Sequence, residues 1–280
     1  MAISDWGRGM TRITFSLPVA LLAVTVAVIV IRPAPGPAEL MPELVHVVDG
    51  PFTYRLAGEF RVGTTIVDAP VQHIAAPVLD IMKYHVSEAD YARCIADDAC
   101  SAIATKGSSK HSQTGVNLSD ATTYARWLSD KTGQQWRLPT DAEWMRIAGN
   151  RNAEDPLAIG ADGADPSQRW LATYRRDAAA RGEADFVAYP QGHFGLNDLG
   201  VADIGGNVWE WTATCFQSGT LRADGTAVTN QSDYCGIRAV QGKHRAYVID
   251  FIRDARSGGC GAGVPPDFLG FRLVRDYAAT

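Results

Sequence analysis

The stretch DIGGNVWEW, Asp203 to Trp211, constrains the fold of this 280-residue chain more than any other segment. Two adjacent glycines and an asparagine favour a tight turn, because glycine adopts backbone conformations that other residues avoid. The two tryptophans on either side of Glu210 indicate a strand with a buried aromatic side chain directly after the turn. Backbone carbonyls and carboxylates in such a turn are suitable ligands for a hard cation such as Ca²⁺.

Strand and helix patterns alternate through the first half of the folded part. Segments 51–63 and 77–87 have the alternation that is typical of strands. Ser87 with Asp90, and Thr140 with Glu143, match the capping pattern at a helix start. The remaining helix is predicted to begin at Ser119 and to end at Gly133.

The second half is punctuated by glycine and predicts short strands joined by long loops. The predicted fold class is therefore α+β with a large share of irregular backbone. No period of about 20 to 50 residues recurs, which argues against a solenoid or a propeller. The formal net charge is −5 and no Lys/Arg-rich run occurs, so we expect no nucleic-acid partner.

The N-terminus has the pattern of an exported, anchored protein. Arg8 and Arg12 precede an uncharged stretch, 13–31, which as a helix spans about 28 Å, close to the thickness of a bilayer core. We therefore predict a cytoplasmic N-terminus, a transmembrane signal anchor and a periplasmic location at the inner membrane. The alternatives are a cleaved signal peptide and a buried core helix. The predicted boundaries are 1–12 cytoplasmic, 13–31 anchor, 32–50 Pro-rich spacer and 51–280 folded domain.

The five cysteines suit an oxidising compartment. Cys94 and Cys100 lie close together, and Cys215 and Cys235 flank a polar, glycine-containing segment. We predict these two local disulfides, which leave Cys260 unpaired. A structural zinc site is disfavoured because no CxxC occurs and no histidine has ligand spacing to these cysteines.

Three blocks together carry a family resemblance: VNLSDATTYARWLSDKTGQQWRLPTDAEWMRIAG, GVADIGGNVWEWT and LGFRLVRD. In this order they resemble the formylglycine-generating-enzyme domain, also called the sulfatase-modifying-factor family, from about Pro51 to Asp276. The resemblance implies a variant of the C-type lectin fold, with small antiparallel sheets, long loops and often bound calcium.

In calcium-binding members of that family, the loop that matches DIGGNVWEW supplies the ligands. Carried over by position, Asp203 and Glu210 would give carboxylates, and Gly206 and Val208 would give main-chain carbonyls. In proteins, Ca²⁺ is bound by roughly six to eight oxygen ligands. The alternative is that Glu210 forms a buried hydrogen bond or ion pair and that the loop holds no metal.

The catalytic pattern of the family is missing. Its chemistry uses two cysteines five positions apart, whose thiolates bind copper. The matching positions hold Lys243 and Val248, and Cys260 lies further on without a partner five residues away. We therefore expect neither copper nor formylglycine synthesis. The iron-dependent branch uses three histidines, and the six histidines here show no such clustering, so iron is not expected either.

The segment that lines the pocket in relatives is basic here. The candidate pocket residues are His244, Arg245, Arg253, Arg256 and Cys260, and if the basic ones converge they would suit an anionic ligand. The alternative is that the arginines pair with neighbouring aspartates, Asp250 and Asp254, and hold the loop.

A narrower resemblance concerns MKYHVSEADYARCIADDAC near the start of the domain and ARSGGCGAG to LGFRLVRD at its end. These resemble the NirV branch, which is associated with copper nitrite reductase. The branch implies an accessory or maturation protein whose client is a periplasmic metalloenzyme. The competing hypothesis is an oxidoreductase with altered chemistry, dependent on a non-haem metal or on Cys260.

Overall fold

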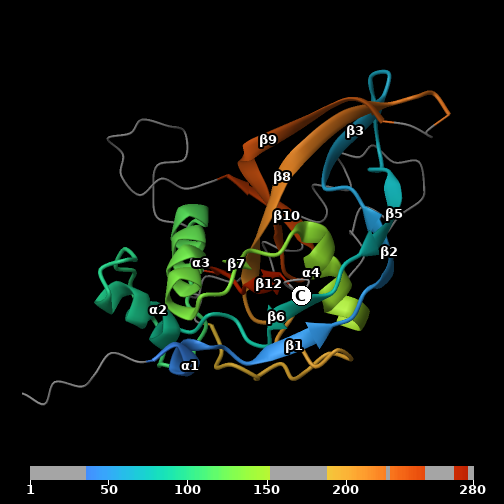
Figure 1. Cartoon of the computed structure of the whole chain (residues 1–280). Coiled ribbons are helices and arrows are strands. Elements are labelled where there is room, and N and C mark those ends of the chain that lie inside the picture. The colour runs from blue at the N-terminus through green and yellow to red at the C-terminus, as the bar shows by residue number, and fades with distance from the viewer. Residues whose placement is uncertain (1–35, 152–187, 225–227, 250–267, 277–280) are drawn as a thin grey trace, which may run out of the picture. The chain divides into compact units, whose positions relative to one another are not determined.

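Figure 1 shows a computed structural model of the chain, which describes residues 36–151, 188–224, 228–249 and 268–276. All of these belong to the larger of two compact units, residues 35–280. The predicted anchor, 13–31, and three candidate site residues, Arg253, Arg256 and Cys260, lie outside the described residues. Among the described helices, none has the length and hydrophobicity that a membrane span requires.

A four-stranded sheet joins the start, middle and end of the domain. Its order is β1–β6–β12–β7, and β12 pairs antiparallel with both β6 and β7. The strands are β1 (Leu44–Val47), β6 (Leu79–Met82), β7 (Trp136–Arg137) and β12 (Val274–Asp276). The sheet thus closes the domain by bringing its two ends together.

The predicted spacer, 32–50, contains ordered structure. It includes α1 (Pro37–Leu40) and β1, so the folded domain begins before Pro51. The reason is burial: Leu40 and Val47 are packed into the core, 8% and 4% exposed. Pro37 stands at the first turn of α1, a position where its missing N–H costs no hydrogen bond. Proline-rich composition alone therefore misled the boundary prediction.

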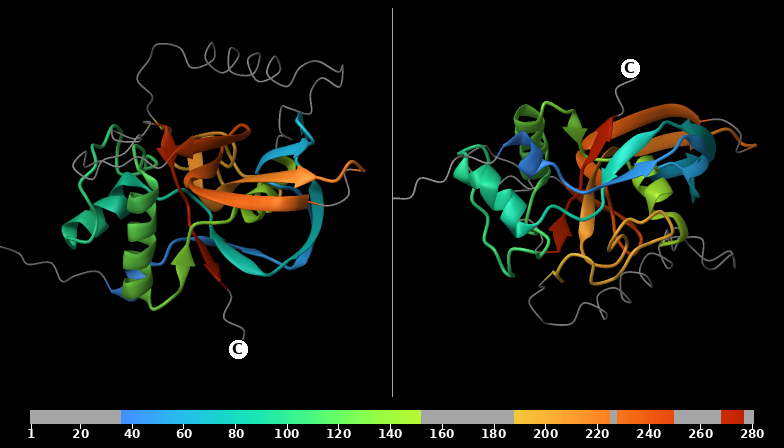
Figure 2. Two further views of the ribbon diagram at one scale, coloured as in Figure 1. Left: turned by 90° about the horizontal axis from the view of Figure 1, so that it is seen from above. Right: turned by 60° about the horizontal axis from the view of Figure 1, so that its bottom comes forward.

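A larger sheet carries the DIGGNVWEW strand. Its order is β10–β9–β8–β3–β4, and β11 pairs parallel with the start of β8. Figure 2 shows β8 and β9 from two further sides as a long curved ribbon. The strands are β3 (Gly58–Val62), β4 (Thr65–Val67), β8 (Trp209–Leu221), β9 (Val228–Gln241), β10 (Arg245–Ile249) and β11 (Leu269–Gly270). The separate two-stranded sheet contains β2 (Gly50–Arg55) and β5 (Val71–Ala76).

The helices begin largely where the capping patterns predict. The Ser87 and Thr140 hydroxyls accept backbone N–H bonds at the starts of α2 and α4, at 3.1 and 3.2 Å. Both reciprocal bonds from Asp90 and Glu143 are present, which confirms the two predicted capping boxes. The helices are α2 (Glu88–Ala96), α3 (Leu118–Thr132), α4 (Asp141–Ala148) and the 3₁₀ turn η1 (Gly149–Arg151).

The start of α3 differs from the prediction. Its N-cap is Asn117 and not Ser119: Asn117 Oδ1 accepts the Asp120 N–H at 2.7 Å, and Asp120 Oδ2 accepts the Asn117 N–H at 2.9 Å. Asparagine caps as well as serine does, and only Asn117 has an acidic partner at the third helical position. The end is as predicted, because Gly133 adopts φ 69°.

Replacing Asn117 by alanine is expected to lower the free energy of unfolding by about 0.5–2 kcal/mol, the usual cost of losing an N-cap. Ser119→Ala is the matched control, since Ser119 lies inside the first turn and alanine is a good helix former. Urea denaturation of both variants measures the difference. Equal losses in the two variants would contradict the assignment of Asn117 as the cap.

The core and the disulfides fix this loop-rich domain. The largest core cluster packs Tyr124 and Trp127 of α3 against Trp211 of β8 and against Phe271. Both predicted disulfides are present: Cys94–Cys100 closes the end of α2, and Cys215–Cys235 links β8 to β9. The α+β class and the local disulfide pairing are thereby confirmed.

Candidate functional site

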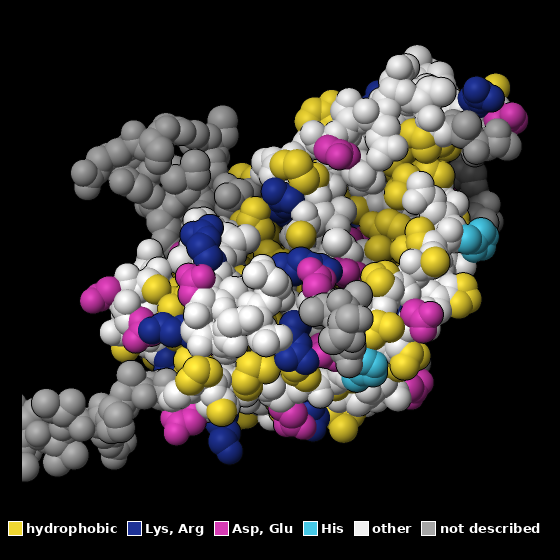
Figure 3. All heavy atoms as spheres, viewed as in Figure 1, with side chains coloured by type: hydrophobic (Ala, Val, Ile, Leu, Met, Phe, Trp, Pro, Cys, Tyr) yellow, Lys and Arg dark blue, Asp and Glu magenta, His cyan; other side chains and the backbone are white. Residues whose placement is uncertain are grey.

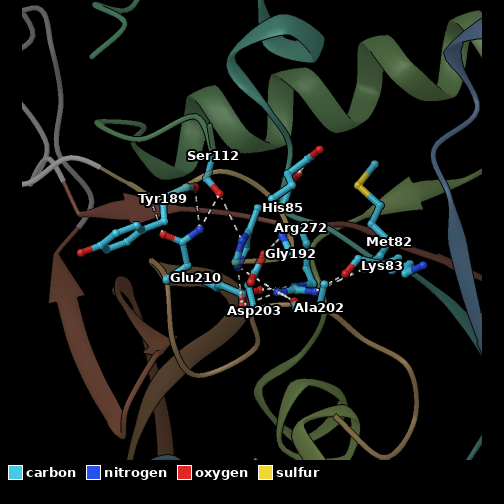
Figure 4. A network of polar contacts seen from close by, with 12 residues as sticks. Met82, Lys83, His85, Ser112, Tyr189, Gly192, Ala202, Asp203, Glu210 and Arg272 are labelled. Atoms are coloured by element: carbon cyan, nitrogen blue, oxygen red, sulfur yellow. Dashed lines mark hydrogen bonds and ion pairs between the residues drawn. The ribbon is translucent and has the colours of Figure 1, made fainter. Parts of the chain in front are cut away.

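The residue at the centre of the predicted site, Glu210, is completely buried. It is the second residue of β8 and lies between Gln241 of β9 and Gly270 of β11 in the sheet. Because strands flank it on both sides, its backbone is fixed and its side chain leaves the sheet in one direction. Figure 4 shows the polar network into which this carboxylate points.

Arg272 neutralises Glu210. Its Nε donates to Glu210 Oε2 at 2.6 Å and its Nη2 to Oε1 at 3.0 Å, a two-pronged pairing of two side chains with no solvent exposure. The guanidinium also donates to the carbonyls of Lys83 and Ala202, each at 3.1 Å. This ion pair therefore links β8, the segment after β6, the loop before β8 and the C-terminal segment.

His85 completes the network. Its Nε2 lies 2.9 Å from Glu210 Oε1 and 2.8 Å from Arg272 Nη2, and its Nδ1 lies 3.2 Å from Ser112 Oγ. Burial and the nearby Arg272 charge lower the pKa of His85, so the ring is neutral. Burial alone would raise the pKa of Glu210, but the charge of Arg272, together with the hydrogen bonds from Arg272 and His85, outweighs it and lowers that pKa to about 2.

The second predicted carboxylate, Asp203, holds the turn in place. Its two oxygens accept the N–H groups of Gly192 and Phe194, at 2.6 and 2.8 Å. Asp203 itself has φ 57° and Gly205 has φ 71°, so the turn passes twice through the left-handed region. The glycines of DIGGNVWEW thus serve a backbone turn that packs on the 192–194 segment.

These residues do not fit a calcium ion in this arrangement. Each carboxylate oxygen of Asp203 and Glu210 already accepts an N–H from the protein. A guanidinium occupies the position next to Glu210 that a cation would take, and a second cation there would be repelled. For Glu210 the structure shows the alternative interpretation, a buried ion pair. Calcium binding through Gly206 and Val208 stays a prediction.

The two positions of the missing cysteines lie on the β9–β10 hairpin. Lys243 is exposed in the turn, and Val248 is half-buried on β10, opposite Arg238 of β9. Val248 packs against the largest core cluster. The valine is thus explained by packing, whereas the lysine reaches solvent.

The two predicted basic pocket residues that the structure describes, His244 and Arg245, point to different partners. His244 packs its ring edge-on against Trp209, with 4.8 Å between ring centroids. Arg245 points inward instead: its Nη2 lies 2.8 Å from Asp141 Oδ2, with side-chain exposures of 4% and 0%. Arg245 is therefore one half of a second buried ion pair. Its partner is Asp141 of α4, not the neighbouring aspartates that the sequence suggested.

Asp141 collects three side-chain donors. Besides Arg245, the Tyr54 hydroxyl donates to Oδ2 at 2.8 Å and Gln241 Nε2 donates to Oδ1 at 2.5 Å. Burial, followed by the charge of Asp141, raises the pKa of Tyr54 well above its ordinary value, so its proton stays in place. Sequence reasoning missed Asp141, because an acidic residue in the first turn of a helix is normally read as a favourable dipole contact.

Comparison with known proteins identifies the family to which this fold belongs. The sulfatase-modifying factor enzyme 1-like domain matches residues 32–277. The chain belongs to this family. The family match begins within the predicted spacer, in agreement with the presence of α1 and β1 in that segment.

Two curated relatives are formylglycine-generating enzymes. The one from Mycobacterium tuberculosis is 34% identical over 113 residues, which are 38% of this chain and 34% of the relative. The one from Streptomyces coelicolor is 29% identical over 187 residues, which are 62% of this chain and 55% of the relative. The alignments thus span about a third to a half of the relatives' own length.

Among solved structures, PvdO from Pseudomonas aeruginosa shares the fold. Its TM-score is 0.55 at 20% sequence identity, over 88% of this chain and 99% of PvdO. At that identity the likeness speaks for the fold alone. The family resemblance inferred from the three sequence blocks is confirmed by these matches.

Proposed function

We propose that this protein is a binding or maturation factor of the sulfatase-modifying-factor family that has no formylglycine-generating activity. The observation that carries the proposal is the state of the cysteines. The chain has five, and four of them form the two disulfides. Only Cys260 remains as a thiol. One chain therefore cannot supply the two thiolates that a bis-cysteine copper site requires.

The hairpin geometry supports the same conclusion. The family resemblance assigns the thiolates to the positions of Lys243 and Val248. Val248 packs against the core and Lys243 faces solvent, so neither offers a soft metal ligand. This part of the surface instead provides the Lys243 ammonium group and the packed rings of Trp209 and His244. Both kinds of group are suited to contact with a partner.

The proposed location is the periplasmic face of the inner membrane, held by the apolar stretch 13–31. Two disulfides support an oxidising compartment. The proposed partner is a protein client, a periplasmic metalloenzyme such as copper nitrite reductase. Figure 3 shows basic and acidic side chains interspersed on the face viewed rather than one basic stripe, which favours a polypeptide over a nucleic acid.

Two measurements on the full chain in detergent test the proposal. Mass spectrometry of a substrate peptide, incubated with the protein and copper, should show no cysteine converted to formylglycine, with the Streptomyces coelicolor enzyme as positive control. Binding of purified copper nitrite reductase, followed by interferometry, should be saturable. Conversion that disappears in Cys260→Ser would instead establish an enzyme with altered chemistry.

A further inference from the structure

A cavity of about 300 Å³ lies between the N-terminal segment 39–43, the end of β6 and helices α2 and α3. Its lining contains neither Lys243 nor Val248, nor any other residue of the β9–β10 hairpin. The volume suits a small ligand or one side chain of a partner. This cavity is distinct from the positions that the family uses for its chemistry, so what it binds is an independent question.

The inner wall of the cavity is apolar and aromatic. Leu40 and Met82 contribute one side, and Tyr124, Trp127 and Leu128 of α3 contribute the other. All five residues are more than nine-tenths buried. Such a wall favours an aliphatic stem, and the aromatic rings add attraction for a cation.

One polar group in this wall has no partner among the described residues. Tyr124 is 3% exposed and lines the cavity, yet its hydroxyl takes part in none of the hydrogen bonds that the described residues form. Its ring is fixed by Tyr91 and Phe271, with ring centroids 5.8 and 5.5 Å away. A phenolic hydroxyl that faces a cavity and has no protein partner among the described residues is available to accept a hydrogen bond from a ligand there.

The charged groups that line the cavity are mainly acidic. Glu39, Glu43 and Asp90 face a single guanidinium, Arg93, which lies 3.5 Å from Asp90. Glu43 also pairs at 2.6 Å with Lys83, a residue that does not line the cavity. Glu39 has no ion-pair partner among the described residues. The surplus of negative charge favours a cationic ligand over an anionic one.

We propose that this cavity binds an alkylammonium group, either a free amine or the side chain of a lysine. The aliphatic stem lies along Leu40, Met82 and Leu128, and the ammonium group meets the carboxylates. The Tyr124 hydroxyl accepts one of its N–H bonds. A lysine side chain has both parts, an apolar stem and a compact charge with three donors.

Titrations of the full chain in detergent, followed by saturation-transfer NMR, test the proposal with four probes. N-acetyl-lysine-N-methylamide is expected to bind, and the 2-aminoheptanoic acid compound of equal length, in which a methyl group replaces the ammonium group, should bind at least about tenfold more weakly. n-Butylammonium chloride separates the two sources: equal affinity indicates a free-amine site, and weaker affinity indicates a lysine of a partner. Stronger binding of butyrate than of butylammonium would overturn the assignment.

Two variants link the binding to this cavity. Tyr124→Phe should weaken the lysine probe about two- to tenfold, the range for one hydrogen bond, with little change in melting temperature because the hydroxyl has no partner among the described residues. Glu39→Gln should weaken it as well, whereas Glu59→Gln, an exposed residue of β3 paired with Arg61 at 2.6 Å, should not. Unchanged affinity in both cavity variants would refute the proposal.

Discussion

Glu210→Gln is expected to lower the free energy of unfolding by about 3–5 kcal/mol, the range found when one member of a buried ion pair is removed. The glutamine has nearly the shape of glutamate but no charge. It would leave the guanidinium of Arg272 buried without a counter-ion, and its amide N–H₂ would face the donors that now bond to a carboxylate oxygen. Urea denaturation followed by circular dichroism measures the loss.

Two further variants separate charge from packing. Glu59→Gln removes the carboxylate of an exposed pair and should change stability little. The double variant Glu210→Gln/Arg272→Met removes both charges, so its loss should be smaller than the sum of the single losses. Additive losses would show that Glu210 and Arg272 do not depend on each other.

The pH dependence of stability is a second test of the Glu210–Arg272 ion pair. The pKa of Glu210 is about 2 in the folded chain, below its ordinary value of 4.5. Its ionised form therefore stabilises the fold above pH 4.5, and this contribution is lost as the pH falls toward 2. The difference in unfolding free energy between the wild type and Glu210→Gln should therefore become smaller as the pH falls from 4.5 toward 2.

Because Arg272 neutralises Glu210, a calcium chelator is expected to leave the melting temperature of the wild type unchanged. At about 100 times its dissociation constant, bound calcium would stabilise by about 2.7 kcal/mol, so a change is easily detected. A chelator-sensitive melting temperature that becomes insensitive in Glu210→Gln would instead support calcium binding by this loop.

Asp141→Asn is the second change with a large expected effect, again about 3–5 kcal/mol of unfolding free energy. Asparagine keeps one carbonyl oxygen but replaces the other by an N–H₂ donor. One of the present donors, Arg245, Tyr54 or Gln241, would then face another donor, and Arg245 would lose its counter-charge. Thermal and urea denaturation both measure this loss.

Asp276→Asn is the matched control for Asp141→Asn. Asp276 also pairs with an arginine, Arg137, at 2.6 Å, but its side chain is 55% exposed. Solvent screens such a pair, and we expect little change in stability. If the two asparagine variants lost the same stability, Arg245 would not depend on Asp141 and would again be a candidate for binding a ligand.

Local sequence determined much of the framework. The capping boxes at Ser87 and Thr140 and the end of α3 at Gly133 follow from side chains within three residues of the backbone groups that they satisfy. The two disulfides join cysteines 6 and 20 positions apart, so proximity in the chain predicted the pairing. The three motif blocks identified the family because they occur together and in order.

Long-range contacts decided what the motif residues do. Glu210 could be a metal ligand or half of an ion pair on the basis of the sequence, and Arg272, 62 positions away, decides between them because it lies beside Glu210 when β11 pairs with β8. Arg245 is buried because α4 brings Asp141 next to it. The sequence by itself determined which residues cap, turn and cross-link, since those contacts are local. The tertiary structure alone decided which charges meet, because a buried charge takes its role from the nearest opposite charge in space.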